Sequence, residues 1–573
     1  MPTEITSARG LDFSKAPYNL SADQIDLVEQ TLSQMSLASK VGQMMCIYFV
    51  GDDVAGWTER MEASKIEPGA IMLLGQDRSS APRNVSHLQD WSRIPLLVAG
   101  NLEAGADTVL SDLTAFASPM QIGASTSPLW ADRLGRYCAR VARDIGLNWA
   151  FAPVVDIVFS PKNPIINTRA FGSDPELVAN MGEAYVRAME SRGIATSVKH
   201  FPGDGVDDRD QHLVATTNSL TVDDWNRSFG NVYRRMVAAG ASTVMVGHIR
   251  QPAYTRELAP GIEDRDILPG SLSTELIEGL LRQTLGFDGL VVSDSSSMAG
   301  ITSIFERGEG LTRAVLAGCD VILGTVDTED DFQKLLQSAE CGAIPIERID
   351  QAVRRVLALK ASLGLLDGRT SATRDSEREP TNAVEESEWR RELAGESATL
   401  VKDTASLLPL NSSRDRRTLV YVLGDEETFY NPAAGLSDRF VHLLRQRGLA
   451  VETRQIPGVA QSLEAAAKFH EGFDLCIYFA NQKYLGNTNT LRVQWTPPRG
   501  PDAPRHVATL PTLLVSIADP FMLQDMPMIR TAVNGYTPTI DVVDAIVERL
   551  FGDAPFVGVS PVDPFAGYWD ARL

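Results

Sequence analysis

The stretch Ser197-Val-Lys-His-Phe-Pro-Gly-Asp-Gly-Val-Asp-Asp-Arg-Asp-Gln-His212 begins as a short apolar strand and runs directly into a loop. This stretch carries two His and four Asp side chains. Pro202, Gly203 and Gly205 let the loop backbone adopt turns that most residues refuse. A loop of this composition is ordinarily a solvated acidic surface. The strands on either side of it decide whether it is more than that.

Short apolar runs rich in Val, Ile and Leu recur on both sides of this stretch, at Met44–Val50, Ala70–Leu74, Pro95–Ala99, Asn148–Val155, Ala195–Val198, Ser242–Val246, Gly289–Ser293 and Cys319–Leu323. They lack strict alternation, which is typical of strands buried on both faces. Helical patterns lie between them, at Pro128–Ile145, Pro175–Arg192, Thr221–Ala239, Ser273–Leu285 and Glu329–Ala339. Strands alternating with helices in this number predict an α/β fold, a (β/α)8 TIM-type barrel.

The C-terminal part of the chain predicts a second domain. A helix over Ile346–Leu365 closes the barrel, and a polar, aperiodic segment follows it. We therefore expect a catalytic barrel over 1–366, a linker over 367–395 and a C-terminal α/β sandwich domain over 396–573. The last has a helix at about 385–400 and strand candidates at Thr418–Leu423, Leu475–Phe479, Thr512–Ile517 and Ile529–Val533. This pattern predicts an open, mostly parallel, flavodoxin-like sheet. Without a phosphate-binding glycine motif, it is expected to support the barrel by packing.

Composition limits the partners of this 573-residue chain. A net charge of -21 and a pI near 4.9 argue against nucleic acid and anionic membranes. The first residues lack the basic and apolar regions of a secretory signal, and no apolar run is long enough to span a membrane. Five scattered cysteines indicate buried thiols in a reducing compartment and no zinc site. We expect a cytoplasmic protein without a metal or cofactor.

Polar side chains follow the ends of five consecutive predicted barrel strands. Because the carboxyl ends of barrel strands meet at one mouth, these side chains are expected to line an active site. They are Asn101, Glu103, Asp156, Lys199, His200, His248 and Asp294.

Two features of the sequence suggest chemistry at this mouth. Asp294 follows the apolar Gly289-Leu-Val-Val-Ser, and a carboxylate on a rigid strand end suits a nucleophile, although it could equally cap the next helix. Asp210 and His212 are two residues apart and can hydrogen-bond in a turn, which leaves the outer imidazole nitrogen free to exchange a proton. Taken alone, most Asp-x-His pairs are accidental.

Together these segments resemble glycoside hydrolase family 3, in its β-N-acetylglucosaminidase branch. The resemblance rests on Phe151-Ala-Pro-Val-Val-Asp156, Arg169-Ala-Phe-Gly-Ser-Asp-Pro175, Lys199-His-Phe-Pro-Gly203, Asp210-Gln-His212, Gly286-Phe-Asp-Gly-Leu-Val-Val-Ser-Asp294, Leu272-Ser-Thr and the segment Leu400–Leu410. It spans roughly residues 25–420.

The resemblance implies a retaining mechanism with a covalent glycosyl-enzyme on Asp294 and an acid/base pair of Asp210 and His212. It further implies that the sugar subsite is lined by Asn101, Glu103, Asp156, Arg169, Lys199 and His200, with Met298 near the nucleophile.

One segment departs from the family pattern. The sugar-gripping motif of the family reads Asp-x-Glu-Gly-Gly, whereas this chain has Asn101-Leu-Glu-Ala-Gly105. Asn101 lacks the charge-assisted acceptor, a difference of ~1–2 kcal/mol, which leaves the identity of the sugar open. The acidic residues Asp204, Asp207 and Asp208 are also expected to disfavour anionic substrates.

The leading hypothesis is an exo-acting β-N-acetylglucosaminidase that releases terminal GlcNAc from small glycosides. A phosphorylase is an alternative, because a His acid/base does not repel phosphate as a carboxylate would. A second alternative is a β-glucosidase-type specificity, which Asn101 favours. A third is a catalytically inactive sugar-binding barrel, which the joint presence of Asp294, Asp210 and His212 disfavours. The sequence leaves open the oligomeric state, and also whether the C-terminal domain contributes to the site.

Overall fold

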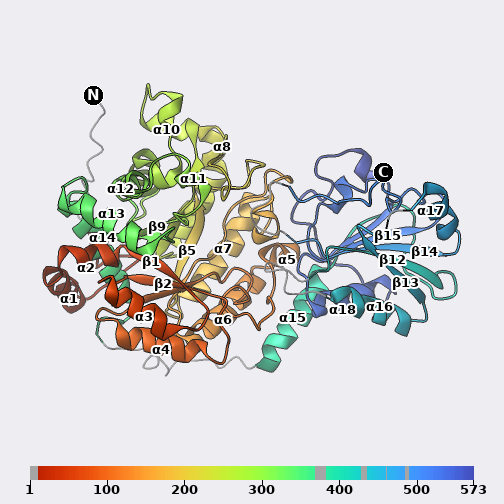
Figure 1. The fold of residues 1–573 in the computed structure, drawn as a ribbon. Helices are drawn as coiled ribbons and strands as arrows, with labels where there is room; N and C mark the ends of the chain where they lie inside the picture. Colours follow the sequence, from red (N-terminus) through yellow and green to blue (C-terminus); the bar gives the residue numbers. More distant parts are fainter. Residues whose placement is uncertain (1–10, 368–382, 427–434, 460, 484–489) are drawn as a thin grey trace. The chain divides into compact units, whose positions relative to one another are not determined.

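The structure is a computed structural model that describes residues 11–367, 383–426, 435–459, 461–483 and 490–573 (Figure 1). The chain divides into two compact units. Unit 1 comprises Met1–Leu113, Ala131–Ile157 and Val178–Thr381, and unit 2 comprises Thr114–Trp130, Val158–Leu177 and Asn382–Leu573. Residues 368–382, which belong to the predicted linker, lie outside the described residues.

Unit 1 contains the predicted barrel. Its eight-stranded parallel sheet has the order β10-β1-β2-β3-β4-β5-β7-β9. A parallel bridge between Val292 in β9 and Val321, which precedes β10, brings the two edges together. The strands are β1 (Met45–Val50), β2 (Ala70–Leu74), β3 (Leu97–Gly100), β4 (Trp149–Ala150), β5 (Ala195–Phe201), β7 (Thr243–Val246), β9 (Leu290–Ser293) and β10 (Ile322–Leu323).

Helices surround this sheet in Figure 1. They are α1 (Ala22–Ser33), α2 (Leu37–Gln43), α3 (Val54–Ala63), α4 (Ala81–Trp91), α6 (Pro128–Ile145), α7 (Pro175–Glu190), α8 (Val222–Arg227), α9 (Phe229–Ala238), α10 (Pro252–Leu258), the π-helix η4 (Glu275–Thr284), α11 (Ala299–Thr302), α12 (Arg307–Ala317), α13 (Thr328–Glu340) and α14 (Ile346–Ser362). Short 3-10 helices lie at η2 (Asp264–Asp266) and η3 (Gly270–Leu272), and β6 (Thr216–Thr217) pairs with β8 (Ile249–Arg250).

The core of the barrel explains why its strands read as continuous apolar runs. Every residue of β3, β5, β7 and β9 is buried. A strand that is covered on both faces has no solvent-facing positions, so its sequence does not alternate. The predicted α/β barrel is confirmed.

Two predicted elements of unit 1 are shorter or interrupted. β4 keeps only two of the eight predicted residues, because Pro153 cannot donate to a neighbouring strand, and pairing resumes in a single bridge between Val154 and Lys199. The predicted helix over Thr221–Ala239 is broken at Ser228, whose hydroxyl donates 2.6 Å back to the carbonyl of Asp224.

Unit 2 is built on a six-stranded sheet with the order β11-β16-β15-β14-β12-β13. The strands are β11 (Thr399–Asp403), β12 (Arg417–Leu423), β13 (Ala450–Ile456), β14 (Leu475–Ala480), β15 (Thr512–Ser516) and β16 (Thr531–Asn534), of which only β11 is antiparallel to its neighbour. The five parallel strands, counted along the chain, are arranged 2-1-3-4-5, so the flavodoxin-like prediction is confirmed.

Helices cover both faces of this sheet. One face packs on α15 (Ala383–Ser397), α16 (Leu436–Gln446) and α18 (Ile540–Leu550). The other packs on α17 (Leu463–His470) and on the residues around the 3-10 helix η6 (Met522–Gln524). A last 3-10 turn, η7, spans Asp570–Arg572.

Two segments from the barrel part of the sequence belong to unit 2. They follow β3 and β4 and contain α5 (Pro119–Ala124) and the 3-10 helix η1 (Asn167–Arg169). Their apolar side chains form one cluster with residues near the C-terminus, comprising Met120, Ala124, Val158, Ile165, Ile166, Ala170, Phe521, Tyr536 and Val562. Arg169, predicted to bind the sugar, therefore lies in unit 2.

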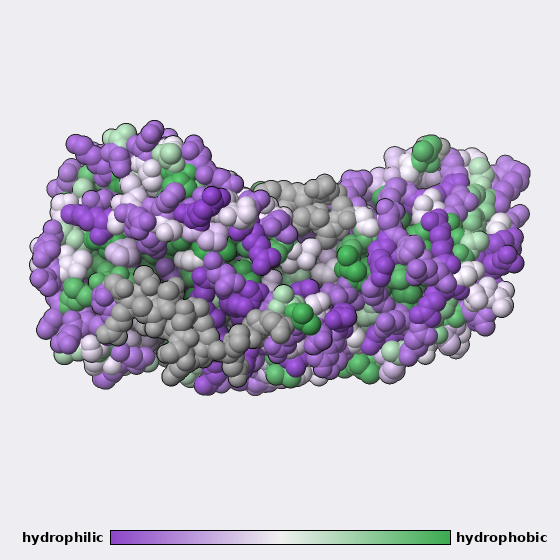
Figure 2. All heavy atoms as spheres, turned by 90° about the horizontal axis from the view of Figure 1, so that it is seen from below, coloured by the Kyte–Doolittle hydropathy of each residue, from purple (hydrophilic) through white to green (hydrophobic). Residues whose placement is uncertain are grey.

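On the face of the molecule seen in Figure 2, hydrophilic residues predominate and hydrophobic ones are scattered among them. Within the described ranges, no helix combines the length and apolar character needed to cross a membrane. Four of the five cysteines are buried as expected, while Cys341, at the end of α13, is exposed.

Candidate active site

The residues predicted to line the barrel mouth, apart from Arg169, all belong to unit 1 and follow the carboxyl ends of β3, β4, β5, β7 and β9. Contacts between residues on neighbouring strands join most of them into one network. The contacts of each residue show what it can do.

Asp294 directly follows β9, and its backbone N–H donates to the carbonyl of Val246 in β7 over 2.8 Å. The carboxylate is partly exposed and accepts from the N–H of Ser295 (2.7 Å). It does not cap the helix that follows, because α11 has Met298 at its N-cap. A strand therefore holds this carboxylate, as a nucleophile requires.

Three histidines set the charge state of Asp294. Burial raises the pKa of the Asp294 carboxyl, but His200, His248 and His212 when protonated, together with the hydrogen bond from the Ser295 N–H, lower it by more, so that the pKa lies below its ordinary value. Asp294 is thus ionised at neutral pH, which is the state that can attack a carbon atom.

Asp210 and His212 form the predicted pair. Oδ1 of Asp210 accepts from Nδ1 of the His212 ring (2.7 Å) and also from the His212 backbone N–H (2.9 Å). Asp210 is fully buried, whereas the His212 side chain keeps 35% of its surface exposed. Among the described residues, no hydrogen bond occupies Nε2 of His212, so this nitrogen can exchange a proton with a ligand.

Asp156 holds His200 and contributes to holding the loop. Its Oδ2 accepts from Nδ1 of His200 (2.7 Å), and its Oδ1 accepts from the backbone N–H groups of His200 (3.2 Å) and Asp204 (2.7 Å). Because Asp156 is completely buried, its carboxylate faces protein groups, and its contact with the sugar stays a prediction of the resemblance.

Lys199 connects two members of the altered sugar-gripping motif. Its Nζ donates to Oδ1 of Asn101 (2.9 Å) and lies 2.7 Å from Oε1 of Glu103. Glu103 is thus a carboxylate partner of Lys199. Lys199 uses one lone pair of the Asn101 oxygen, and Asn101 carries an amide N–H2 donor where the family Asp has only acceptor oxygens.

Lys199 and His200 are adjacent in β5, where the side chains of a regular strand would point to opposite faces. The strand is irregular here, because the pairing of β5 with β7 shifts register between Val198 and Phe201. This irregularity covers the two functional residues themselves.

His248 is buried, and protein groups engage both of its ring nitrogens. Nε2 donates to the carbonyl of Ser295 (2.9 Å), and Nδ1 accepts from the hydroxyl of Ser271 (2.8 Å). Burial lowers the pKa of His248, in keeping with a neutral ring. Its ring nitrogens therefore fix the backbone beside Asp294, and a sugar could meet only carbon atoms of this ring.

The acidic residues of the loop present less charge than their number predicts. Asp204 accepts from the N–H of Gly205 (2.6 Å) and from Nε2 of Gln211 (3.1 Å). Asp207 forms a two-point ion pair with Arg209 (2.6 and 2.9 Å). Asp207 is thus offset by a cation, and Asp208 is the exposed one of the three, so the expected bias against anionic substrates rests on Asp204 and Asp208.

Two predicted residues lie apart from these contacts. Met298 is buried at the N-cap of α11, four residues after Asp294, with its N–H donating to the carbonyl of Ser295 (3.1 Å). Arg169 in η1 donates from Nη1 to the carbonyl of Ile165 (3.2 Å). Its sugar contact stays a prediction of the resemblance.

Tyr48 contacts the segment after Asp294 but was not identified from the sequence. Its hydroxyl donates to Oγ of Ser295 (2.8 Å), and burial raises its pKa to about 12, so it stays a donor. Tyr48 lies in β1 within an apolar run, which concealed it. Its intermediate exposure within an otherwise buried part of the strand is a structural signal that the composition does not carry.

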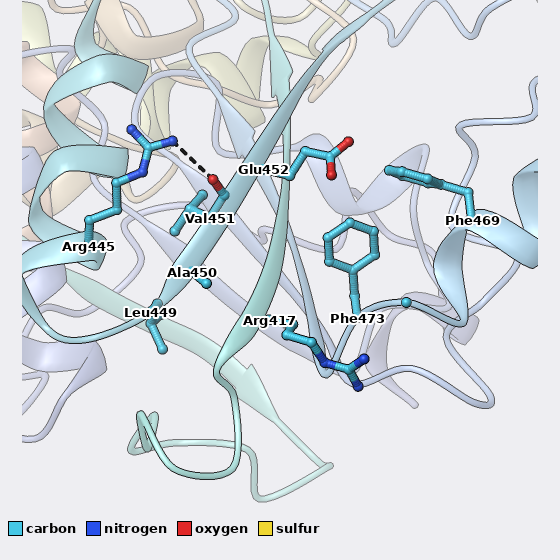
Figure 3. A pocket seen from close by; sticks show the side chains of 9 residues that line it. Arg417, Arg445, Leu449, Ala450, Val451, Glu452, Phe469 and Phe473 are labelled. Atoms are coloured by element: carbon cyan, nitrogen blue, oxygen red, sulfur yellow. Dashed lines mark hydrogen bonds between the residues drawn. The ribbon is translucent and has the colours of Figure 1, made fainter.

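Metal-binding groups and surface grooves were also considered as possible sites. In the described part of the chain, no group of three or more His, Cys, Asp or Glu is placed to hold a metal ion. A groove of about 720 Å³ in unit 2 lies along β12, β13 and the end of α17, with Arg417, Glu452, Phe469 and Phe473 among its lining residues (Figure 3). None of the predicted site residues lines it.

The chain was compared with known proteins. Residues 36–359 match the model of the glycosyl hydrolase family 3 N terminal domain. A "Beta-N-acetylglucosaminidase/beta-glucosidase" of Cellulomonas fimi is 42% identical over 98% of this chain and 100% of its own length. Among solved structures, "Beta-glucoside phosphorylase BglX" has a TM-score of 0.88, 37% identity and coverage of 98% of this chain and 99% of the other.

A second solved structure is also similar to this chain. The family 3 β-N-acetylglucosaminidase from Paenibacillus sp. has a TM-score of 0.78 at 25% identity, covering 93% of this chain and all of the other. The family model covers more than half of the chain, and the Cellulomonas fimi relative matches it over nearly its whole length. The barrel, its mouth and these matches agree, and the chain belongs to glycoside hydrolase family 3.

Proposed function

We propose that this glycosidase is an exo-acting, retaining enzyme that cleaves terminal β-linked GlcNAc, and with it glucose, from small glycosides. The observation that carries the proposal is the Asp210–His212 pair, joined at 2.7 Å, with the His212 carbonyl accepting from the N–H of Ala299, five residues after Asp294 (3.0 Å). The printed name of the Cellulomonas fimi relative, which includes both sugars' activities, supports this breadth.

In the first step, an oxygen of Asp294 attacks the anomeric carbon and the bond to the leaving group breaks. Protonated His212 gives its Nε2 proton to the departing oxygen. Asp210 stabilises the cationic ring through Nδ1. In the second step, neutral His212 takes a proton from water, whose oxygen attacks the anomeric carbon and releases Asp294.

A histidine acid/base suits this site. When the second step begins, the leaving carboxylate of Asp294 regains its negative charge. A second carboxylate beside it would be a like charge, whereas His212 is neutral or cationic. The buried carboxylate of Asp210 is offset by its hydrogen bonds to His212.

Sugar binding is assigned to the donors of the mouth. Lys199 and the amide of Asn101 are the donors next to Glu103, and His200 offers the ring nitrogen that Asp156 does not use. Arg169 is included on the strength of the family motif. Because this chain has Asn101 where the family motif has Asp, we expect a weaker preference between GlcNAc and glucose.

The test is hydrolysis of the nitrophenyl β-glycosides of GlcNAc and glucose by the wild type and by His212→Ala. We expect cleavage of both sugars, with GlcNAc preferred, and a loss of about 100- to 10,000-fold in the variant on substrates with poor leaving groups. Full activity of His212→Ala on those substrates would refute the acid/base assignment. Asp294→Ala provides the inactive control.

Phosphate is the second candidate for the acceptor, in place of water. The 37% identical relative named as a β-glucoside phosphorylase matches nearly the whole chain, and Asp204 and Asp207 of the loop are engaged by protein groups. Phosphate would then attack the glycosyl-enzyme and yield the sugar 1-phosphate. Product analysis with and without phosphate separates the two: free sugar in both cases supports hydrolysis, and sugar 1-phosphate supports phosphorolysis.

A further inference from the structure

Gln211, between Asp210 and His212, uses both ends of its side-chain amide. The oxygen Oε1 accepts from the backbone N–H of His248 (3.0 Å), and Nε2 donates to Oδ2 of Asp204 (3.1 Å). The side chain is completely buried, although the loop on which it lies is mostly polar. A residue that turns inward from a loop exposed at Asp208 and Arg209, and satisfies both polar ends, is well placed to anchor that loop.

The two partners of Gln211 are themselves fixed to the barrel. His248 follows β7, and its ring is held by Ser271 and Ser295 (2.8 and 2.9 Å). Asp204 follows β5, and its N–H donates to Oδ1 of the buried Asp156 (2.7 Å). Gln211 thus links the loop to the ends of two neighbouring strands.

Close packing leaves little room for other arrangements of this residue. A Cβ on Gly247 would lie 3.0 Å from Oε1 of Gln211, and one on Gly300 would lie 2.7 Å from the Gln211 carbonyl. The following residue is also held, because the N–H of Ala299 donates to the His212 carbonyl (3.0 Å). Glycines at these two points allow the loop backbone to approach the mouth.

The acid/base pair needs such an anchor. The hydrogen bonds within the pair orient the His212 ring relative to Asp210, but they do not tie either residue to the barrel. Proton transfer to a glycosidic oxygen depends on the position of Nε2 to within a fraction of an ångström. The partly exposed His212 ring cannot supply that position by packing.

We propose that Gln211 is a positioning residue that locks the Asp210–His212 pair onto the barrel mouth through His248 and Asp204. This inference rests on the proposed role of His212 as the acid/base. It assigns a task to a side chain that touches neither the substrate nor the reacting atoms.

The test uses Gln211→Met, which keeps the size of the side chain and removes both hydrogen bonds. Rates are measured on β-glycosides with a good leaving group (dinitrophenolate) and a poor one (phenolate). Because only the poor leaving group needs a proton, we expect kcat/KM to fall about 10- to 100-fold for the phenyl glycoside and less than about threefold for the dinitrophenyl glycoside. Equal losses on both substrates, or none, would overturn the proposal.

Two further variants distinguish a positioning role of Gln211 from a general loss of structure. Gln251 is an equally buried glutamine of unit 1 that uses both amide ends, on the Tyr254 N–H (2.8 Å) and the Leu220 carbonyl (2.9 Å). Gln251→Met should therefore change both rates alike. In a His212→Ala background, Gln211→Met should cause no additional leaving-group effect, because the group that it positions is gone.

Exchanging the donor and the acceptor between Gln211 and Asp204 provides a rescue experiment. Gln211→Glu alone places a carboxylate against Asp204 and should impair the phenyl glycoside reaction. Gln211→Glu with Asp204→Asn reverses the donor and acceptor of that hydrogen bond, keeps the acceptor for the His248 N–H, and should restore at least half of the lost rate. Failure of the double variant, when its melting temperature matches wild type, contradicts the proposal.

The outcomes separate this inference from the proposed function. If His212→Ala shows no leaving-group dependence, the acid/base assignment fails and the role of Gln211 fails with it. If His212→Ala shows that dependence and Gln211→Met does not, only the role of Gln211 is wrong.

Discussion

At the residue scale, the site keeps one carboxylate ionised among three histidines. Burial raises the pKa of Asp294, while His200, His248 and His212 when protonated, with the hydrogen bond from the Ser295 N–H, lower it by more. The Asp294 carboxylate therefore stays negatively charged even at pH values somewhat below the ordinary pKa of Asp. The acidic limb of the activity profile, where Asp294 takes up a proton, should therefore lie in strongly acidic solution.

Replacing His200 tests this balance. His200→Gln removes the largest of the three favourable charges on Asp294, so the pKa of Asp294 should rise and the acidic limb of the kcat/KM profile should move to higher pH. The pH profile on a dinitrophenyl glycoside checks this, since that substrate does not need the acid. An unmoved acidic limb would contradict the assignment of that limb to Asp294.

Asn101 tests sugar recognition. Asn101→Asp restores the family residue beside Lys199 and gives a sugar hydroxyl a charged acceptor. Binding should strengthen by about 1–2 kcal/mol, a fall in KM of about 5- to 30-fold. KM values for the GlcNAc and glucose substrates measure it, with Asn101→Ala as the control that lacks both functions. A higher KM in Asn101→Asp than in the wild type would show that a donor is needed at this position.

At the element scale, the sequence predicted the barrel strands well and their ends less well. Runs such as Ala70–Leu74 matched because a doubly buried strand needs apolar residues throughout. β4 ended early at a proline, and β13 was missed because its exposed edge position admits Glu, Thr, Arg and Gln. The predicted helix over about 385–400 extends past α15 into β11, since residues Thr399 and Leu400 fit either pattern.

The turn after β5 has its own requirement. Gly203 has a φ of +118°, and a Cβ there would lie 2.2 Å from the ring of Phe229 in α9. Gly203→Ala should therefore lower the melting temperature and the activity together, because the ring or the loop must move. Gly240→Ala, with a φ of +91° and open space around its Cβ, isolates the backbone contribution. Equal effects of the two variants on melting temperature and activity would show that the contact with Phe229 is unimportant.

For the candidate site, the sequence predicted some of the contacts between the named residues and not others. Asp210 and His212 bond as their spacing predicted. Asp156 and His248 turned out to face protein groups, and Tyr48 and Gln211 gained partners that lie far away in the chain. These pairings depend on which strands become neighbours, which a local pattern does not record.

At the scale of the whole molecule, the folding units do not follow the order of the chain. Residues 114–130 and 158–177 follow barrel strands in sequence but pack with the C-terminal sheet in unit 2. Their polar contacts agree, for example Asn167 Nδ2 with Oδ1 of Asp519 (3.1 Å). Local composition cannot indicate such packing, because the two partners are some 350 residues apart.

Unit 2 should lose stability in acid. His506 is buried with both ring nitrogens unpaired among the described residues, its ring lies 4.1 Å from that of His470, and burial lowers its pKa to about 3. The unfolded chain has a His pKa of about 6.5. The contribution of neutral His506 is therefore complete above pH 6.5 and is lost progressively as the pH falls towards 3.

Urea unfolding of unit 2 between pH 7 and pH 5 measures this slope. His506→Phe should flatten it, because the variant has no ring to protonate in the unfolded state. His87→Gln, at an exposed position of α4 in unit 1, should leave it unchanged. A slope that persists in His506→Phe would assign the acid sensitivity to other groups.

The central claim is that Asp294 forms the covalent bond to the sugar. The most direct measurement is mass spectrometry of the digested enzyme after inactivation by dinitrophenyl 2-deoxy-2-fluoro-β-glucoside, in which the fluorine slows release of the glycosyl-enzyme. The account predicts one added fluoroglucosyl group on the peptide that contains Asp294, and none in Asp294→Ala. An adduct on another residue, such as Glu103, would contradict it.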